Sequence, residues 1–534
     1  MGTGTGTNVK HAPSFESRAL RLANLGLRAL ALVLFATAGV VFVSHALLLW
    51  PFTVDDTFIT LRYAGRLASG RGLSWNDGEA PVEGYTSFSW ALLLAIPHWF
   101  SADAEWHAKA GSLAATGVLL ALLAAGAAWL TPARTGVRVV AAALAATLLA
   151  LDPSAAVHAV SGMDTALFAL LLTGVFLALL AAESVPGART FGLLALLGLA
   201  CGMTRPEGNL VWGAGTLVLL ARLREERRRT ALRVLLAGYV APGAIYFAWR
   251  YSTYGLLFPL PVYAKAVNTD AMLAGVPEAV SYAHDLFWRN PAFAACIVFG
   301  AIALRGKSLS LSCGAGSLLL ASLKPAPLMA YEHRYLYPLI PLFCVLAVLG
   351  LVSISQALAR FAFGRAASGA TGVALGSVLL AGFTAHAHVD HLRGALAEFR
   401  DYGAGLHRAH VSLGRALAQK RAAIAVPRVA LLDAGAVAYY SEWSVIDTFG
   451  LNDRHIALHG RGDPAYVLGR NPHALIVVSS RSDAYVAVFD YEAELHRSAR
   501  AAGYDFWRSY AFAPDYHLRV LVRRGTPGFA LRQE

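Results

Sequence analysis

Long apolar stretches separated by short polar ones fill the chain from residue 29 to residue 385. The first stretch, Ala29 to Trp50, is about 22 residues long, which is enough to cross a bilayer. It follows a basic stretch and ends at Trp50-Pro51 instead of a small-residue cleavage site, so the pattern predicts a membrane span and not a signal peptide. About eleven transmembrane helices are therefore expected in all. The ten further predicted spans are 109–130, 139–157, 164–182, 190–203, 208–222, 231–249, 291–304, 309–323, 334–355 and 369–385.

Two segments depart from this pattern. Residues 51–108 form a large loop after the first span, and their apolar stretch from Phe88 to Phe100 is too short to cross a bilayer. This stretch is predicted to be a juxtamembrane or re-entrant helix. After residue 385 the apolar runs shorten to strand length and alternate with helical patterns, which is typical of a compact α/β domain. The expected strands are Val429–Leu432, Ser444–Ile446, Ala474–Val478 and Leu518–Val522, and the expected helices cover 391–420 and 485–502.

The pattern thus divides the chain into three parts. We expect a tail over residues 1–28, a transmembrane domain over 29–385 that includes the loop 51–108, and an α/β domain over 386–534. Composition agrees, because 57% of the residues are apolar and only 15% are charged, whereas soluble domains carry roughly a quarter charged residues. This composition fits neither a disordered protein nor an ordinary cytosolic enzyme well.

The charges indicate an orientation. The chain carries 45 Lys and Arg against 33 Asp and Glu, a net charge of +12. If the tail is cytoplasmic, basic residues fall in every cytoplasmic loop, as the positive-inside rule requires. We therefore expect a multi-pass protein of the inner (cytoplasmic) membrane, with the loop 51–108 and the α/β domain on the periplasmic or extracellular side, and no nucleic-acid partner. The basic residues of the expected cytoplasmic loops are Arg134, Arg138, Arg189, Arg222, Arg224, Arg227, Arg228, Arg229, Arg233, Arg305, Lys307, Arg360 and Arg365.

The candidate chemistry begins directly after the first span. Asp55 and Asp56 are adjacent carboxylates at the membrane–water boundary, where one could take a proton from an acceptor hydroxyl and the other could orient a substrate or ligate a metal. Arg62 could bind a phosphate. The alternative is that the acids only cap a helix. Whether a divalent metal assists the reaction stays open.

Aromatic and polar side chains alternate farther along the same loop. Glu83, Tyr85 and Trp90 lie in this stretch, and such a mixture suits sugar binding, since rings stack on sugar faces while polar groups bind hydroxyls. An aromatic belt at the membrane interface would explain the rings equally well.

The run from Asp55 to Trp90 resembles the first-loop signature of the GT-C superfamily of integral membrane glycosyltransferases, in particular the AftB-type polyprenyl-phosphate-dependent arabinofuranosyltransferases. Further segments are similar to that family in the same order along the chain. They are Ser161–Phe168, Thr204–Gly208, Tyr254–Pro259 with Tyr263–Lys265, His333–Pro338, Asp433–Gly435 and Val445–Asp453. Two positions differ from the family pattern, which usually has Glu in place of Asp164 and Asn in place of Leu260.

The resemblance implies a GT-C-like membrane domain that moves a sugar, arabinofuranose in this subfamily, from a polyprenyl-phosphate donor at the bilayer to a glycan or glycoprotein acceptor. It places the catalytic base on Asp55 or Asp56, and we favour Asp55 slightly. Lys265 and Arg334 are the other candidates for the donor phosphate, although Lys265 could instead extend to the membrane surface. The other expected substrate-binding residues are Asp164, Arg205, Glu207, Tyr263 and His333.

Several alternatives remain at this stage. Arg205 and Glu207 could form a structural ion pair, and His333 could bond only to a helix end. A transporter or flippase of lipid-linked sugars would also carry charges within the membrane, but it would be expected to show repeat symmetry between its halves. A non-catalytic protein of envelope assembly would not need the paired acids.

Overall fold

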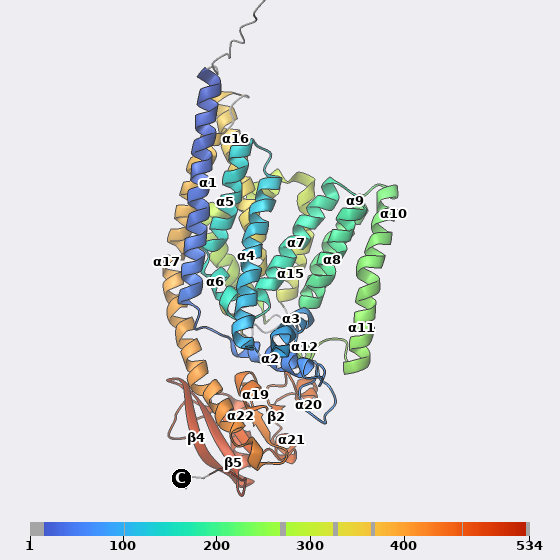
Figure 1. Ribbon diagram of the computed structural model, residues 1–534, viewed down its shortest axis with the longest axis vertical. Coiled ribbons are helices and arrows are strands. Elements are labelled where there is room, and N and C mark those ends of the chain that lie inside the picture. The colour runs from blue at the N-terminus through green and yellow to red at the C-terminus, as the bar shows by residue number, and fades with distance from the viewer. Residues whose placement is uncertain are drawn as a thin grey trace, which may run out of the picture.

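A computed structural model describes residues 15–100, 102–267, 274–323, 329–364, 369–461 and 463–529. Residues 1–14 of the predicted tail and Arg365 lie outside the described residues. Figure 1 shows a bundle of long helices with a smaller domain of strands and short helices at one end. The long helix α17 (Ala370–Leu406) runs from the bundle into this smaller domain without a break at residue 385, so the boundary predicted there stays a prediction.

Each of the eleven predicted spans falls on a helix. Among the described residues, six helices are long and apolar enough to cross a membrane, or eight if two bent helix pairs each count as one span. One of these pairs, α5 and α6 (Pro153–Val160), bends by 68° at Asp152 and Pro153. The helices on the predicted spans are α1 (Phe15–Leu48), α4 (Ala104–Leu130), α5 (Thr135–Ala150), α7 (Thr165–Ser184), α8 (Ala188–Thr204), α9 (Glu207–Arg222), α10 (Glu225–Leu235) with α11 (Ala241–Tyr254), α14 (Pro291–Ala303), α15 (Ser308–Ser322), α16 (Ile340–Phe363) and α17 (Ala370–Leu406).

Shorter helices fill the space between the bundle and the smaller domain (Figure 1). The first loop forms α2 (Asp55–Ala68) and α3 (Phe88–Trp99), and α3 coincides with the predicted juxtamembrane helix. Two other short helices, α12 (Leu260–Val267) and α13 (Val276–His284), lie between the bundle helices α11 and α14 in the chain. A turn of 3-10 helix, η4 (Tyr331–His333), precedes α16.

The smaller domain is built on one five-stranded sheet with the order β2-β1-β3-β5-β4. Its first three strands are parallel, whereas β5 is antiparallel to β3 and β4. Four strands were predicted; β4 was missed because polar residues such as Asp505 and Arg508 interrupt its apolar pattern. The strands are β1 (Arg428–Leu431), β2 (Ser444–Asp447), β3 (Ala474–Ser479), β4 (Tyr504–Ala513) and β5 (Tyr516–Arg523), and the helices are η6 (His407–Val411), α18 (Ser412–Ala418), α19 (Ala436–Ser441), α20 (Arg454–His459), α21 (Pro464–Gly469) and α22 (Asp490–Ala501).

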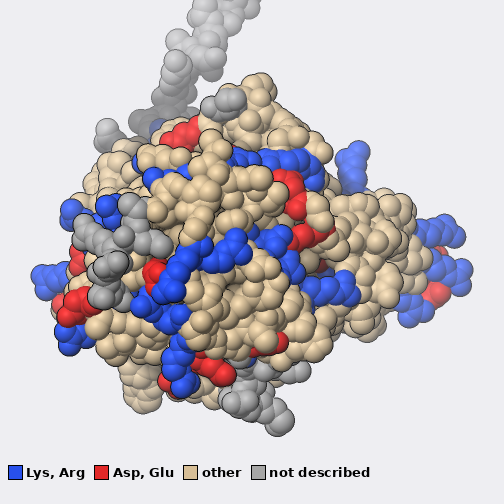
Figure 2. All heavy atoms as spheres, turned by 90° about the horizontal axis from the view of Figure 1, so that it is seen from below, with Lys and Arg blue, Asp and Glu red and all other residues tan. Residues whose placement is uncertain are grey.

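Charged side chains of both signs are spread across the end of the molecule that carries this domain (Figure 2). Such a surface is suited to water and contrasts with the apolar helices of the bundle, many of whose large side chains are exposed on their outer faces. The fold therefore consists of a bundle with a membrane-like exterior and a domain with an aqueous one.

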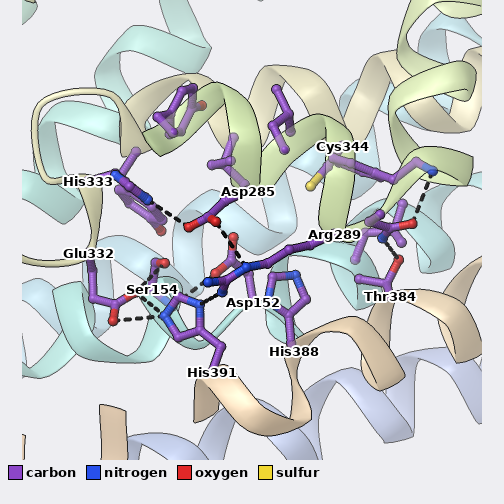
Figure 3. A pocket seen from close by; sticks show the side chains of 17 residues that line it. Asp152, Ser154, Asp285, Arg289, Glu332, His333, Cys344, Thr384, His388 and His391 are labelled. Carbon is purple, nitrogen blue, oxygen red and sulfur yellow. Dashed lines mark hydrogen bonds and ion pairs between the residues drawn. The ribbon is translucent and has the colours of Figure 1, made fainter. Parts of the chain in front are cut away.

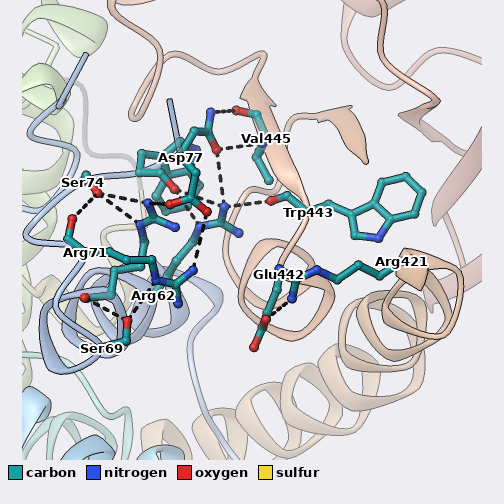
Figure 4. Close-up of polar contacts among 12 residues, drawn as sticks. Arg62, Ser69, Arg71, Ser74, Asp77, Arg421, Glu442, Trp443 and Val445 are labelled. Carbon is teal, nitrogen blue, oxygen red and sulfur yellow. Dashed lines mark hydrogen bonds and ion pairs between the residues drawn. The ribbon is translucent and has the colours of Figure 1, made fainter. Parts of the chain in front are cut away.

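The buried Arg62 of α2 ties the first loop to the α/β domain (Figure 4). Its guanidinium donates to the carbonyl oxygen of Trp75 from Nε and Nη2, at 3.2 and 3.1 Å, and to the carbonyl oxygen of Trp443 at 2.8 Å. It also donates to the carbonyl oxygen of Ala438. One cation therefore satisfies backbone acceptors from both parts of the molecule, so Arg62 is not available to a donor phosphate as the sequence had suggested.

Two further contacts fix the same interface. The Asn76 side chain bonds to both the N–H and the carbonyl oxygen of Val445 at 2.9 Å, so the loop covers the edge of β2. Gly84 packs so closely on the domain that a Cβ atom there would lie 1.8 Å from Oδ1 of Asn452. The first loop thus forms the surface on which the α/β domain packs.

We predict that Arg62→Ala lowers the free energy of unfolding by about 3 kcal/mol or more, because buried carbonyl oxygens lose a charged donor. Equilibrium denaturation of the purified protein in detergent measures this. The control is Arg71→Ala, which removes a half-exposed side chain from the same loop and should change stability by no more than about 0.5 kcal/mol. Equal effects of the two substitutions would contradict the assignment of Arg62 as the anchor.

Candidate functional site

A cavity of about 380 Å³ lies between the end of the bundle and the α/β domain. The bundle side is formed by α2, the loop around Tyr85, α12 and the segment before α16, and the other side by η6 and by loops and strands of the α/β domain. Five of the residues singled out in the sequence line it together: Asp55, Asp56, Tyr85, Lys265 and Arg334. Segments nearly 300 residues apart in the chain thus meet in one space.

On the bundle side, the carboxylate of Asp56 and two cations, Lys265 and Arg334, line the cavity. Nη1 of Arg334 lies 3.5 Å from Oδ2 of Asp56, and Nε of Arg334 is buried without a hydrogen-bond partner in the described part of the chain. Lys265 donates from Nζ to the hydroxyl of Tyr335 at 2.8 Å. A buried donor without a partner is costly unless a ligand satisfies it, so this wall is suited to an anion.

Asp55 has a different environment from its neighbour. Its two carboxylate oxygens accept hydrogen bonds from the backbone N–H groups of Gly435 at 3.0 Å and Ala436 at 2.8 Å, at the start of α19. A Cβ atom on Gly435 would lie 2.4 Å from Oδ2 of Asp55, so only glycine fits there. Asp55 therefore does cap a helix, as the alternative interpretation held, but this helix belongs to the α/β domain. Asp56, whose side chain is 29% exposed, is the freer carboxylate, which reverses the preference drawn from the sequence.

Burial changes the acidity of Asp55. Desolvation raises the pKa of its carboxyl group to about 7, and the nearby positive charge of His410 and the backbone N–H of Ala436 oppose this effect. A carboxyl group with this pKa carries its charge only part of the time near neutral pH.

The α/β domain contributes an aromatic wall with one polar cluster. Oδ2 of Asp433 accepts a hydrogen bond from the Tyr516 hydroxyl at 2.8 Å and lies 3.0 Å from Nε2 of His410. Phe449, Phe489 and Phe512 line the same space. These residues have no local sequence signal of their own, although Asp433 lies two residues after the end of the parallel strand β1, a position where ligand-binding residues are common in α/β sheets.

Four other expected substrate-binding residues have structural partners. Asp164 and Arg205 form a buried two-point ion pair with N–O distances of 2.9 and 3.0 Å, so Arg205 pairs with Asp164 and not with Glu207 as considered. Glu83 pairs with Arg250 at 2.7 Å. Trp90 donates from Nε1 to the carbonyl oxygen of Gly162 at 3.0 Å. These side chains do not line the cavity.

Glu207, Tyr263 and His333 also lie outside the cavity lining. Glu207 begins α9, and the Tyr263 hydroxyl accepts a hydrogen bond from the backbone N–H of Phe258 at 3.4 Å. His333 lies between Glu278 and Asp285. It lines a second, separate cavity of about 60 Å³ with Glu332 and His391 (Figure 3). Within the described ranges, no group of three or more His, Cys, Asp or Glu side chains is arranged to hold a metal ion.

Comparison with known proteins identifies the fold. Residues 399–527 match the model of a family described as a domain of unknown function, DUF8728. No curated protein sequence matches the chain. The structure is similar to ArnT from Cupriavidus metallidurans bound to undecaprenyl phosphate, with a TM-score of 0.55 and 15% identity over 93% of this chain and 98% of that one. The apo state of the same ArnT gives a TM-score of 0.55 and 14% identity over 90% and 97%.

A third structure, the oligosaccharyltransferase AglB from Archaeoglobus fulgidus, covers 93% of this chain and 74% of its own at 12% identity, with a TM-score of 0.49. The ArnT likeness spans nearly the whole of both chains, so it includes the bundle and the α/β domain together. The fold class expected from the sequence, a GT-C-like helical membrane domain followed by a small α/β domain, is therefore confirmed.

We predict a pH dependence of stability that arises from Asp55. Because the pKa of Asp55 is about 7 in the folded protein and lies near 4 in an unfolded chain, the folded state binds the extra proton between these values and stability falls as pH rises from about 4 to about 7. Asp55→Asn removes this titration. Between pH 5 and pH 8, the melting temperature of the natural protein should fall more than that of the variant. Equal falls in the two proteins would refute the prediction.

Proposed function

We propose that this chain is an inverting membrane glycosyltransferase that moves a sugar from a polyprenyl-phosphate donor to a glycan or glycoprotein acceptor in the cavity between the two domains. The observation that carries the proposal is the Asp56 carboxylate beside Arg334, whose buried Nε has no hydrogen-bond partner among the described residues. These groups match the two requirements of the reaction, a base for the acceptor and donors for a phosphate.

In the proposed mechanism, Asp56 takes the proton of an acceptor hydroxyl. The oxygen then attacks the anomeric carbon from the face opposite the phosphate, and a new C–O bond forms with inversion. The bond between the anomeric carbon and the phosphate oxygen breaks, its electron pair stays on that oxygen, and polyprenyl phosphate leaves. Arg334 and Lys265 stabilise the negative charge that develops on this oxygen. Asp55 holds α19 in place and thereby the opposite wall.

The lipid carrier is supported by two independent lines. The ArnT structure that this chain resembles is bound to undecaprenyl phosphate. In addition, the cavity is lined by residues of α2 and α12, and these helices lie at the end of the helical bundle (Figure 1). A phosphate could therefore reach it while its polyprenyl tail stays among apolar helices. Arabinofuranose is the sugar we propose, on the resemblance of the first-loop and later segments to AftB-type enzymes.

The acceptor side is assigned to the α/β domain. Phe449, Phe489 and Phe512 offer ring faces on which a sugar can stack, and Asp433 offers a carboxylate for its hydroxyl groups. We place this domain on the periplasmic or extracellular side of the inner membrane, with the N-terminus in the cytoplasm, because the loops at the far end of the bundle are basic.

We expect Asp56→Asn to lower the transfer rate by about 10² to 10⁴, because it removes the general base while keeping the side-chain shape. The measurement is transfer of arabinofuranose from its polyprenyl-phosphate donor by purified protein, with the corresponding mannose donor as the test of sugar choice. Asp77→Asn, which changes an exposed acid of the same loop, is the control. Undiminished transfer by Asp56→Asn would exclude Asp56 as the base, and no transfer by the natural protein from either donor would count against the proposed reaction.

The orientation gives a separate prediction. In a Cys313→Ser background, which removes the native cysteine that is not buried, Asp515→Cys should react with a membrane-impermeant thiol reagent in intact cells. Arg228→Cys should react only after the cells are opened. The reverse pattern would overturn the assignment of the two sides.

A further inference from the structure

The short turn that carries Arg334 has side chains anchored on both of its sides. Arg334 lines the large cavity, and the hydroxyl of the next residue, Tyr335, accepts the hydrogen bond from Lys265. The two preceding residues, Glu332 and His333, instead line the smaller cavity (Figure 3). The turn therefore separates the site from a second polar cluster.

The backbone of this turn is strained. Glu332 has φ +50° and ψ +42°, and His333 also has φ +50°. Residues with a Cβ atom rarely adopt this left-handed conformation, and two in succession are unfavourable unless other contacts hold them. The conformation of the turn must therefore be imposed by its surroundings.

Glu332 provides the first of these contacts. Its carboxylate oxygens lie 2.9 and 2.8 Å from Nε2 of His391 on α17, and one of them accepts a hydrogen bond from the Ser154 hydroxyl on α6 at 2.8 Å. Its backbone oxygen lies 3.0 Å from Nε2 of His158, also on α6. The residue is thus fixed to two helices through both its side chain and its backbone.

His333 provides the second contact, to a different part of the bundle. Its Nδ1 lies 2.7 Å from Oε1 of Glu278 on α13, and its Nε2 lies 3.1 Å from Oδ2 of Asp285. Arg289 lies 2.9 Å from the other oxygen of Asp285 and completes the chain of charges. Adjacent residues are therefore held by different helices, Glu332 by α6 and α17 and His333 by α13 and the turn that follows it.

Arg334, in contrast, is weakly held by its own side chain. Its ion pair with Asp56 is long, at 3.5 Å, and its Nε has no hydrogen-bond partner in the described ranges. The rings of Tyr331 and Tyr335 lie 5.9 and 5.8 Å from its guanidinium carbon, at the limit of a cation–π contact. Its place in the cavity is therefore set mainly by the backbone that carries it.

We propose that Glu332 and His333 are positioning residues that hold the Arg334 guanidinium ready for the lipid phosphate. Fixing Arg334 through its backbone leaves its N–H groups for the phosphate and avoids the cost of ordering a long side chain when the ligand binds. The proposal rests on the proposed function, since it takes the phosphate of the carrier lipid as the ligand of Arg334.

A double-mutant cycle on the full-length protein in detergent tests this, with binding of undecaprenyl phosphate as the readout. Glu332→Gly removes the anchoring carboxylate, and glycine leaves the backbone free to adopt conformations other than the left-handed one. We expect it to weaken binding about fivefold and also to lower thermal stability, because His391 and Ser154 lose a buried partner. Arg334→Ala should weaken binding about tenfold or more. The double variant should bind no more weakly than Arg334→Ala alone, because Glu332 acts through Arg334.

The outcomes separate the two proposals. If the effects of Glu332→Gly and Arg334→Ala multiply in the double variant, Glu332 acts independently of Arg334 and the positioning role is wrong, whereas the phosphate site stands. If Arg334→Ala binds as tightly as the natural protein, the phosphate site itself is wrong. Glu332→Gln keeps the size of the side chain and one acceptor oxygen, so it should give an intermediate loss of binding affinity. It replaces Glu332→Gly in the cycle if the glycine variant does not fold. Asp390→Asn, an exposed change on α17 near His391, should have no effect.

Discussion

The arrangement of the site depends on how two charged side chains of α2 bond to the backbone of the α/β domain. Asp55 accepts hydrogen bonds from two N–H groups at the start of α19, and Arg62 donates to the carbonyl oxygens of Ala438, within α19, and of Trp443, just beyond its end. Both are buried. Because the desolvation of a buried charge is offset only when its hydrogen bonds are well formed, these contacts hold the domain at one distance from the bundle. Asp56 follows Asp55 directly, so the same docking determines where the proposed base lies relative to the wall across the cavity.

The buried charges of the molecule fall into two groups with different roles. Asp164 with Arg205 and Glu83 with Arg250 are close two-point pairs. They join helices and loops through contacts of 2.7 to 3.0 Å, and none of the four residues lines the cavity. The pair of Asp56 and Arg334 is longer, at 3.5 Å, and both of its residues line the cavity. This difference favours a structural role for the first group and a ligand for the second.

Much of the fold could be predicted from the sequence because its signals are local. Apolar runs located a helix at each of the eleven predicted spans, although only six to eight candidate spans among the described residues are long and apolar enough to cross a membrane. Alternation with turn residues located four of the five strands. Five of the segments that resemble the AftB-type family also meet at the cavity, since Asp56, Lys265, Arg334, Asp433 and Phe449 each come from a different one of them. The partners of the charged residues could not be predicted, because Arg62 bonds to Trp443 and Asp55 to Ala436 across more than 370 residues. No local pattern distinguishes a carboxylate that caps a distant helix from a neighbour that faces a cavity.

The proposed reaction requires that the cavity between the bundle and the α/β domain binds the phosphate of the carrier lipid at Arg334 and Lys265. An experimental structure of the protein with undecaprenyl phosphate would show where the phosphate binds. We expect the phosphate in this cavity, with an oxygen within about 3 Å of the Arg334 guanidinium and the lipid tail directed toward the helical bundle. A phosphate bound elsewhere, such as beside Arg205 or Arg289, with Arg334 still paired only with Asp56, would contradict this expectation.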